Sequence, residues 1–191
     1  TKYMYEFTHR FDGEALDSTI YVSTDIRGGT LQRLHITESA YISDRQKLKA
    51  GSKQAVPLTG AISEETTGNG FNEFYDDYMF AKDNPNPGLM DYKTFFYSWV
   101  ENPEYILPGT IDKYDSVELD IKRIAKEQLN INLTDGQLLW RRWKKKELSS
   151  RGDMEGIKLN SDQLFKQEYP LTLIEAFQSG AGNIFDAELI D

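Results

Sequence analysis

Two short segments carry residue types that can act on a phosphate. Residues 34–36 (Leu-His-Ile) form an apolar run, which Thr37 and Glu38 close with a hydroxyl and a carboxylate. Residues 65–70 (Glu-Thr-Thr-Gly-Asn-Gly) form a polar, glycine-rich turn. Nucleotide hydrolysis needs a carboxylate that orients the attacking water, and a polar group that helps to hold the Mg²⁺ shell. If residues 34–36 are a strand, Thr37 and Glu38 stand at its carboxyl end, where α/β sheets bind their ligands.

Each segment also has an ordinary structural interpretation. Polar residues commonly follow an apolar strand, and Thr37 stands where such sites more often have Asp. A neutral hydroxyl would hold a Mg²⁺-bound water more weakly than a carboxylate does. In the second segment, small residues let a backbone approach a ligand closely, and hydroxyls or an amide can sense a phosphate. A plain tight turn explains the same residues.

Composition limits the classes of function. The 191 residues suffice for one domain or slightly more, and 39% hydrophobic with 13% aromatic residues indicate a packed globular protein. The formal charge of -9 argues against a broad, sequence-independent grip on nucleic acid, although residues 141–146 are a local basic run. The absence of cysteine and the presence of only two histidines exclude Cys-based and His-rich metal sites.

The sequence contains no apolar run long enough to span a membrane and no recognisable signal peptide. We therefore expect an intracellular location. Since the chain begins with Thr1 and enters strand-like sequence at once, we also expect it to be a piece of a longer protein.

The first 70 residues are typical of strands and turns. Runs of β-branched and aromatic residues predict strands, and residues 46–50 predict a short helix ended by Gly51. Strands separated by helical connections indicate an α/β sheet with parallel pairings. The predicted strands are residues 3–7, 18–22, 31–36 and 55–62.

After Gly70 the pattern becomes mainly helical. A helix is predicted from Phe71, with one buried apolar stripe. Residues 92–100 then predict an aromatic strand, and from about residue 115 helices follow with capping-box spacing at their starts. The stripe comprises Phe71, Phe74, Tyr75, Tyr78 and Met79, and the predicted capping pairs are Asp115 with Glu118, Thr134 with Gln137, and Thr172 with Glu175.

Four segments in this order resemble a known family. Residues 27–38 resemble the Walker B region of phage terminase large subunits, ATPases that package viral DNA and whose strand commonly reads Leu-His-Ile, a small hydroxyl residue, then Glu. Residues 65–75 look like the coupling motif of that family, with its Asn-Gly and following Phe-Tyr. Residues 96–105 are similar to the segment after the ATPase sheet. Residues 133–140 and 167–177 look like the linker helices that lead to the nuclease domain.

The resemblance implies a fold and an activity for the intact protein. Residues 1–110 would be the C-terminal half of an α/β, P-loop (ASCE-type) ATPase core, and residues 111–191 a helical linker subdomain leading toward an endonuclease domain outside the chain. With ATP and Mg²⁺, the intact enzyme would drive double-stranded DNA into a prohead in the host cytoplasm. Its partners would be the portal or procapsid, the small terminase subunit and further copies in a ring.

No G-x-x-x-x-G-K-[ST] motif occurs in the sequence, so the phosphate-binding loop is absent and we expect the chain alone to be inactive. The resemblance makes Glu38 the catalytic carboxylate, and Arg27 could stabilise charge on the nucleotide or act on a neighbouring subunit. A solvated turn arginine is the alternative for Arg27. The residues implied to bind ATP or its Mg²⁺ are Thr37, Thr66, Thr67, Gly68, Asn69 and Gly70.

Two other functions remain open at this point. The first is another P-loop motor, such as a helicase. The second is a non-catalytic capsid or DNA adaptor that works through the basic run at residues 141–146, whose positive charges could contact phosphates. A solvated helix face is the ordinary interpretation of the same run.

Overall fold

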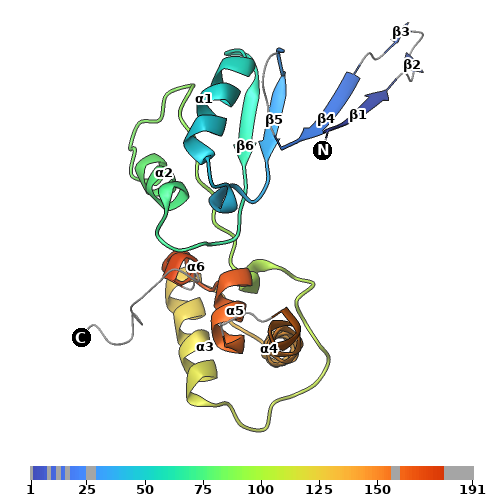
Figure 1. The fold of residues 1–191 in the computed structure, drawn as a ribbon. Coiled ribbons are helices and arrows are strands. Elements are labelled where there is room, and N and C mark those ends of the chain that lie inside the picture. Colours follow the sequence, from blue (N-terminus) through green and yellow to red (C-terminus); the bar gives the residue numbers. More distant parts are fainter. Residues whose placement is uncertain are drawn as a thin grey trace. The chain divides into compact units, whose positions relative to one another are not determined.

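The computed structural model describes residues 2–7, 10–11, 14–15, 18–24, 29–155 and 160–178 (Figure 1). The fold is mixed α/β, as predicted. The chain divides into two compact units. Unit 1 comprises residues 1–37 and 42–64, and unit 2 comprises residues 38–41 and 65–191. The described strands form two-stranded sheets, so the larger P-loop sheet stays a prediction.

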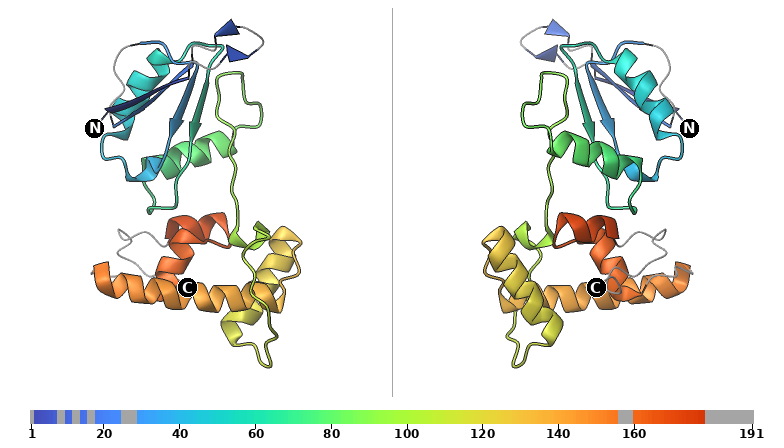
Figure 2. Two further views of the ribbon diagram at one scale, coloured as in Figure 1. Left: turned by 90° about the vertical axis from the view of Figure 1, so that its right-hand side faces the viewer. Right: turned by 90° about the vertical axis from the view of Figure 1, so that its left-hand side faces the viewer.

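A parallel strand pair with one covering helix forms the core of unit 1. Strand β5 (Arg33–Ile36) pairs in parallel with β6 (Ala61–Glu64), which confirms the predicted parallel pairing. Leu34 and Ile36 are buried and alternate with exposed residues, as a half-covered strand requires. They pack with Val56, at the end of helix α1 (Arg45–Ala55), which lies beside the two strands in Figure 2.

The predicted boundaries around α1 were wrong. The helix does not end at Gly51 but continues to Ala55. Its stop signal is Pro57, because the residue before a proline is driven out of the helical region, and Val56 is extended. The predicted strand 55–62 therefore begins only at Ala61. Between them lies a turn in which the Gly60 N–H donates to the Pro57 carbonyl at 2.8 Å.

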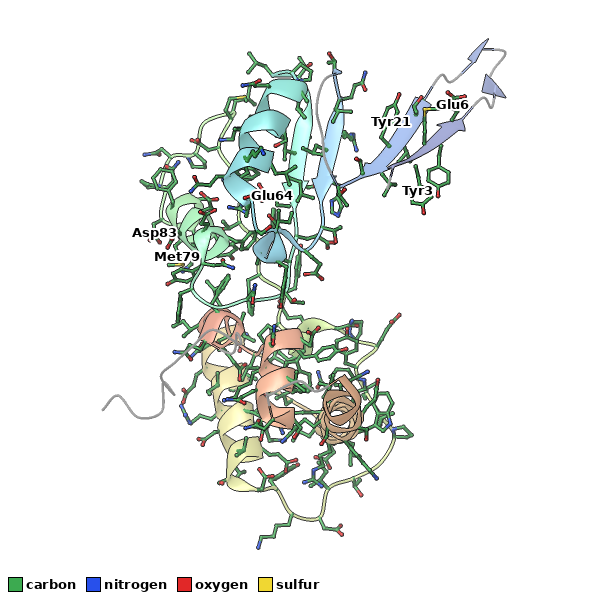
Figure 3. All side chains as sticks on the ribbon, in the orientation of Figure 1. Tyr3, Glu6, Tyr21, Glu64, Met79 and Asp83 are labelled. Carbon is green, nitrogen blue, oxygen red and sulfur yellow. The ribbon has the colours of Figure 1, made fainter. Side chains whose placement is uncertain are left out.

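The N-terminal strands were predicted correctly, but they pair with each other. Strand β1 (Lys2–Phe7) and β4 (Ser18–Ser23) form an antiparallel ribbon, with Tyr3 opposite Val22. The short strands β2 (Arg10–Phe11) and β3 (Glu14–Ala15) form a second antiparallel pair. Aromatic side chains of the ribbon are exposed, among them Tyr3 and Tyr21, which Figure 3 labels.

Unit 2 begins with a 3-10 turn and a capped helix. The 3-10 helix η1 spans Ser39–Tyr41, and helix α2 spans Glu73–Lys82. The α2 helix starts two residues later than predicted because the Asn72 side chain accepts the N–H groups of Phe74 and Tyr75. The predicted stripe on this helix is only half-buried, and Phe71 lies before the helix and is exposed.

The predicted strand at residues 92–100 was wrong. Residues 92–98 have no strand pairing, and a 3-10 helix, η2 (Trp99–Glu101), follows them. Exposed and half-buried side chains alternate along residues 92–97, so the segment has the periodicity of a strand without a strand partner among the described residues. A period of two in the sequence reports side-chain exposure and cannot supply the hydrogen-bonding partner that a sheet needs.

An aromatic core holds the helical part of unit 2 together. The ring of Trp140 stacks on Tyr105 at a centroid distance of 4.1 Å and lies 5.8 Å from Trp99. Phe165 and Tyr169 meet it edge-on. Since Trp99 and Tyr105 belong to this core, it includes residues before position 110, while the functional division at residues 110 and 111 stays a prediction. The helices are α3 (Ser116–Leu129), α4 (Asp135–Glu155), α5 (Ser161–Glu168) and α6 (Leu173–Gln178).

Local capping signals predicted the starts of α3, α4 and α6. Asp115 with Glu118 forms the predicted capping box at α3. At α4, the Gln137 carboxamide accepts the Thr134 N–H and the Thr134 hydroxyl accepts the Gln137 N–H. At α6 the Thr172 hydroxyl accepts the Glu175 N–H at 3.2 Å, and the Glu175 carboxylate accepts from the N–H groups of Leu171 and Thr172. A further capping box, Asn160 with Gln163 at α5, was missed.

A nearly inaccessible carboxylate joins α3 to α4. The Glu118 side chain is 1% exposed, and both its oxygens accept from Arg142, at 2.6 and 2.7 Å. The paired guanidinium holds the pKa of Glu118 below its ordinary value, against the opposing effect of burial. The folded state therefore favours the carboxylate, and this stabilisation is present above the unfolded-state pKa and lost as the pH falls through the folded-state pKa.

The Arg142→Met variant is expected to unfold more easily at neutral pH, by about 2 kcal/mol, because it leaves the Glu118 charge buried without its partner. The half-exposed guanidinium keeps this cost below that of a fully buried pair. The loss should shrink below the ordinary pKa of a glutamate, as Glu118 becomes protonated. Urea unfolding across this pH range measures it. Arg123→Met, at an exposed arginine on α3, is the control, and an equal loss in both variants would contradict the assignment.

Leu138 lies at the centre of the helical core and is fully buried. Leu138→Ala is expected to cost about 2–5 kcal/mol of unfolding free energy, from lost burial and the cavity left behind. Leu119→Ala, at a leucine of α3 that is 54% exposed, should cost far less. Denaturant unfolding of both variants measures the difference, and similar midpoints would be inconsistent with this core.

Candidate functional site

The backbone at Glu38 is held in an unfavourable conformation. Glu38 has a φ of 52°, in the left-handed region that non-glycine residues rarely adopt. Its carbonyl accepts the Tyr41 N–H at 3.0 Å, which closes η1. A left-handed conformation costs roughly 1–2 kcal/mol for an L-residue, so its surroundings must hold it. Such strain often marks functional positions.

The carboxylate of Glu38 faces the glycine-rich turn. Its Oε2 accepts from the Thr67 N–H at 3.4 Å and shares the proton of the Thr66 hydroxyl, at 3.3 Å, with the nearer Thr67 carbonyl at 2.8 Å. The structure thus brings together the two segments that the sequence singled out. Both bonds are long and Glu38 is exposed, so the carboxylate keeps capacity to orient a water molecule.

Hydrogen bonds between main chain and side chains fix the turn against η1. The Ser39 N–H donates to the Glu65 carbonyl at 3.0 Å, and the Ala40 N–H donates to the Thr66 hydroxyl at 3.3 Å. The Ala40 carbonyl accepts from the side-chain amides of Asn69 and Asn72, at 3.1 and 2.9 Å.

The Asn72 side chain therefore has a double role, since its oxygen also caps α2. Through this one side chain, η1, the turn and the start of α2 form a single hydrogen-bonded unit.

The turn requires glycine at positions 68 and 70 for two different structural reasons. Gly70 has a φ of 70°, which favours glycine. Gly68 is needed for space, because a Cβ there would lie 1.8 Å from the carbonyl oxygen of Ala176 on α6. The backbone of the turn thus packs directly on the backbone of α6. Close approach to a ligand at Gly68 stays a prediction.

The carboxyl group of Glu175, on α6, is largely buried close to this contact. Burial raises its pKa, while the Leu171 N–H that it accepts lowers it. Its raised pKa means that the folded state binds this proton more tightly than the unfolded state does. Stability from this group falls as the pH rises from the ordinary glutamate pKa through the folded-state pKa. The group accepts from the backbone just before α6 and does not point to chemistry at the turn.

The other predicted site residues have separate outcomes. Thr37 is exposed and belongs to unit 1. Arg27 lies outside the described residues, so its role stays a prediction. Sequence reasoning missed Tyr41, whose ring hydroxyl contacts the turn, and gave Asn72 and Gln167 no part in the site. An asparagine directly before a predicted helix, as at Asn72, indicates an N-cap. No comparable pattern in the sequence indicates that Tyr41 or Gln167 contacts the turn.

Four of the five basic side chains in the run form ion pairs within unit 2. Arg142 binds Glu118, and Lys144 pairs with Glu147 at 2.7 Å. Both Arg141 and Lys145 lie within ion-pair distance of Asp162 on α5. The run is therefore not simply a solvated helix face, because its charges join α4 to α3 and α5.

The donor set at Glu38 suits a metal that is held mainly by water and phosphate. Among the described residues, no group of three or more His, Asp or Glu side chains is arranged to hold a metal ion. Magnesium usually keeps several waters and takes one or two protein oxygens together with substrate phosphates. The exposed carboxylate of Glu38 is compatible with a contact to such a hydrated ion.

The comparisons add no family. The chain matches no protein-family model, no curated protein and no solved structure. In the described part of the chain, no helix has both the length and the apolar character needed to cross a bilayer.

A Gly68→Ala substitution is expected to displace α6 or the turn, because its methyl group would overlap the Ala176 carbonyl. Overpacking of this kind typically costs about 1–3 kcal/mol. Thermal unfolding measures the loss. The Gly88→Ala variant is the control, since a Cβ there meets only a side-chain oxygen at 3.4 Å. Equal stability of the two variants would refute the close packing of the turn on α6.

Proposed function

We propose that the chain is the Walker B and coupling part of a phage terminase large subunit, the ATPase that drives DNA packaging. The observation that carries this proposal is the contact between Glu38 and residues Thr66 and Thr67. A catalytic carboxylate that follows a strand and touches a polar turn is what the resemblance implies.

In this proposal Glu38 orients the attacking water. Its exposed carboxylate, with long hydrogen bonds to the turn, supports such a role, because a carboxylate saturated by short bonds would have less capacity for water. Thr37, its neighbour in sequence, would contact a water of the Mg²⁺ shell. Arg27 would stabilise charge that develops on the transferred phosphoryl group.

The turn would report the state of the nucleotide to the helices. Thr66 and Thr67 both contact Glu38, and the turn continues through Gly68, Asn69 and Gly70 to the N-cap of α2. A small change at the carboxylate would therefore act on groups that also hold the start of a helix. This arrangement supports the coupling function that the resemblance assigns to residues 66–70.

The intact protein would supply what this chain lacks. A phosphate-binding loop would hold ATP with Mg²⁺, and a nuclease domain would follow the linker. Assembly into a ring at the portal, with the small subunit and double-stranded DNA, belongs to the same proposal. The core of the proposal is narrower: residues 34–38 and 65–70 form the hydrolytic half of an ATPase site.

Of the two alternatives, the adaptor that works through residues 141–146 has less support. The ion pairs of Arg141, Arg142, Lys144 and Lys145 would have to break or be shared before these side chains could contact phosphates. Another P-loop motor, such as a helicase, would use Glu38 in the same way. The sequences flanking the chain would distinguish it from a terminase.

In the full-length protein, Glu38→Gln is expected to abolish ATP hydrolysis and to spare ATP binding, because the amide keeps the shape of the side chain but cannot take up the proton of the attacking water. Steady-state turnover and nucleotide-binding titration measure the two properties. Glu104→Gln, at an exposed glutamate of the same unit, is the matched control. Turnover retained by Glu38→Gln would overturn the proposal.

A further inference from the structure

The hydroxyl of Tyr41 connects three segments of unit 2 that are distant in sequence. It donates to the Gly68 carbonyl at 3.1 Å. It accepts from the Thr67 hydroxyl at 3.4 Å and from the side-chain amide of Gln167, on α5, at 2.6 Å. Tyr41 and Gln167 are 126 residues apart in the chain. Tyr41 lies three residues after Glu38, in η1.

These bonds use the full capacity of the phenol. A tyrosine hydroxyl has one proton to donate and two lone pairs that accept. All three positions are filled by Gly68, Thr67 and Gln167. A saturated hydroxyl has a single preferred orientation, so a shift of one partner must strain the bonds to the other two.

Gln167 is buried next to the aromatic core. Its helix, α5, packs into this core through Phe165 and the flanking Tyr169, whose rings both contact Trp140. The short bond from its amide therefore links the turn to a rigid part of the helical core. The contact of Gly68 with Ala176, on α6, is a second and independent link from the same turn.

We infer that Tyr41 is a positioning residue, which holds the turn that contacts Glu38 in register with α5 through Gln167. The mechanical part of this inference, that Tyr41 and Gln167 hold the turn in place, concerns the folded chain alone. The catalytic part, that this placement of the turn sets the rate of hydrolysis, rests on the proposed function. Motion of α5 would then alter the placement of Thr67 and, through the Thr67 N–H, the Glu38 carboxylate.

Amide hydrogen exchange on the chain itself tests the mechanical part without ATP. Tyr41→Phe removes only the hydroxyl, and Gln167→Met removes the amide at similar length. A hydrogen bond contributes about 1 kcal/mol net, so Gln167→Met should speed exchange about fivefold at Thr67 and in the last turn of α5 alike. Tyr41→Phe also removes the bonds to Gly68 and Thr67, so it should speed exchange at Thr67 at least as much, with the same fivefold effect on α5. The double variant should add little to either single one, since all three remove the same link.

Two control variants separate this link from general loosening. Tyr97→Phe removes a hydroxyl from a ring that is 77% exposed, and Gln128→Met changes an exposed glutamine of α3. Neither should alter exchange at Thr67. If Tyr41→Phe speeds exchange only within the turn, or if the effects of the two substitutions add fully, the link between turn and α5 is refuted.

The catalytic part needs the full-length protein. Tyr41→Phe and Gln167→Met are each expected to lower kcat about fivefold and to leave KM nearly unchanged, because they disturb the placement of Glu38 and not ATP binding. Unchanged kcat in both variants would overturn this part, even where the exchange data support the link. Turnover retained by Glu38→Gln would instead identify a failure of the proposed function, and the exchange experiment would still decide the link.

Discussion

The carbonyl of Ala40 accepts hydrogen bonds from two asparagine side chains, Asn69 and Asn72, and the arrangement of the candidate site depends on this junction. In the sequence, Ala40 is separated from the two asparagines by α1 and β6. A carbonyl with both acceptor positions filled fixes η1 against the turn, and Asn72 then fixes the turn against α2. The left-handed backbone of Glu38 is sustained by the same set of bonds, since it enters η1 directly.

Gly68 and Tyr41 connect this junction to the helical core by two different kinds of contact. Gly68 acts through the absence of a side chain, which lets the turn lie on the α6 backbone. Tyr41 acts through a side chain whose hydroxyl reaches Gln167 on α5. One contact depends on shape and the other on directed hydrogen bonds, so they restrict different motions of the turn. The carboxylate at Glu38 is consequently placed by helices that are remote in sequence.

Three ion pairs of the described residues join different helices of unit 2. Within the acidic chain, the basic run on α4 binds carboxylates of α3, α4 and α5, including the buried Glu118. Pairing of this kind lowers the positive potential of the run, in which Arg141 and Lys145 share the single carboxylate of Asp162.

The sequence alone determined the features whose causes are local. The starts of α3 and α4 followed from capping pairs three residues apart, and strands β1, β4 and β5 followed from their apolar patterns. It also singled out Glu38 and residues 65–70, since polar groups after an apolar strand and a glycine-rich turn are visible in one dimension. Only the tertiary structure decided that residues 92–98 have no strand partner in the described part of the chain, that four of the five basic residues in 141–146 form ion pairs, and that Tyr41 meets Gln167. The reason is physical: strand pairing, ion pairing and the filling of a hydroxyl need partners that the fold brings from distant positions.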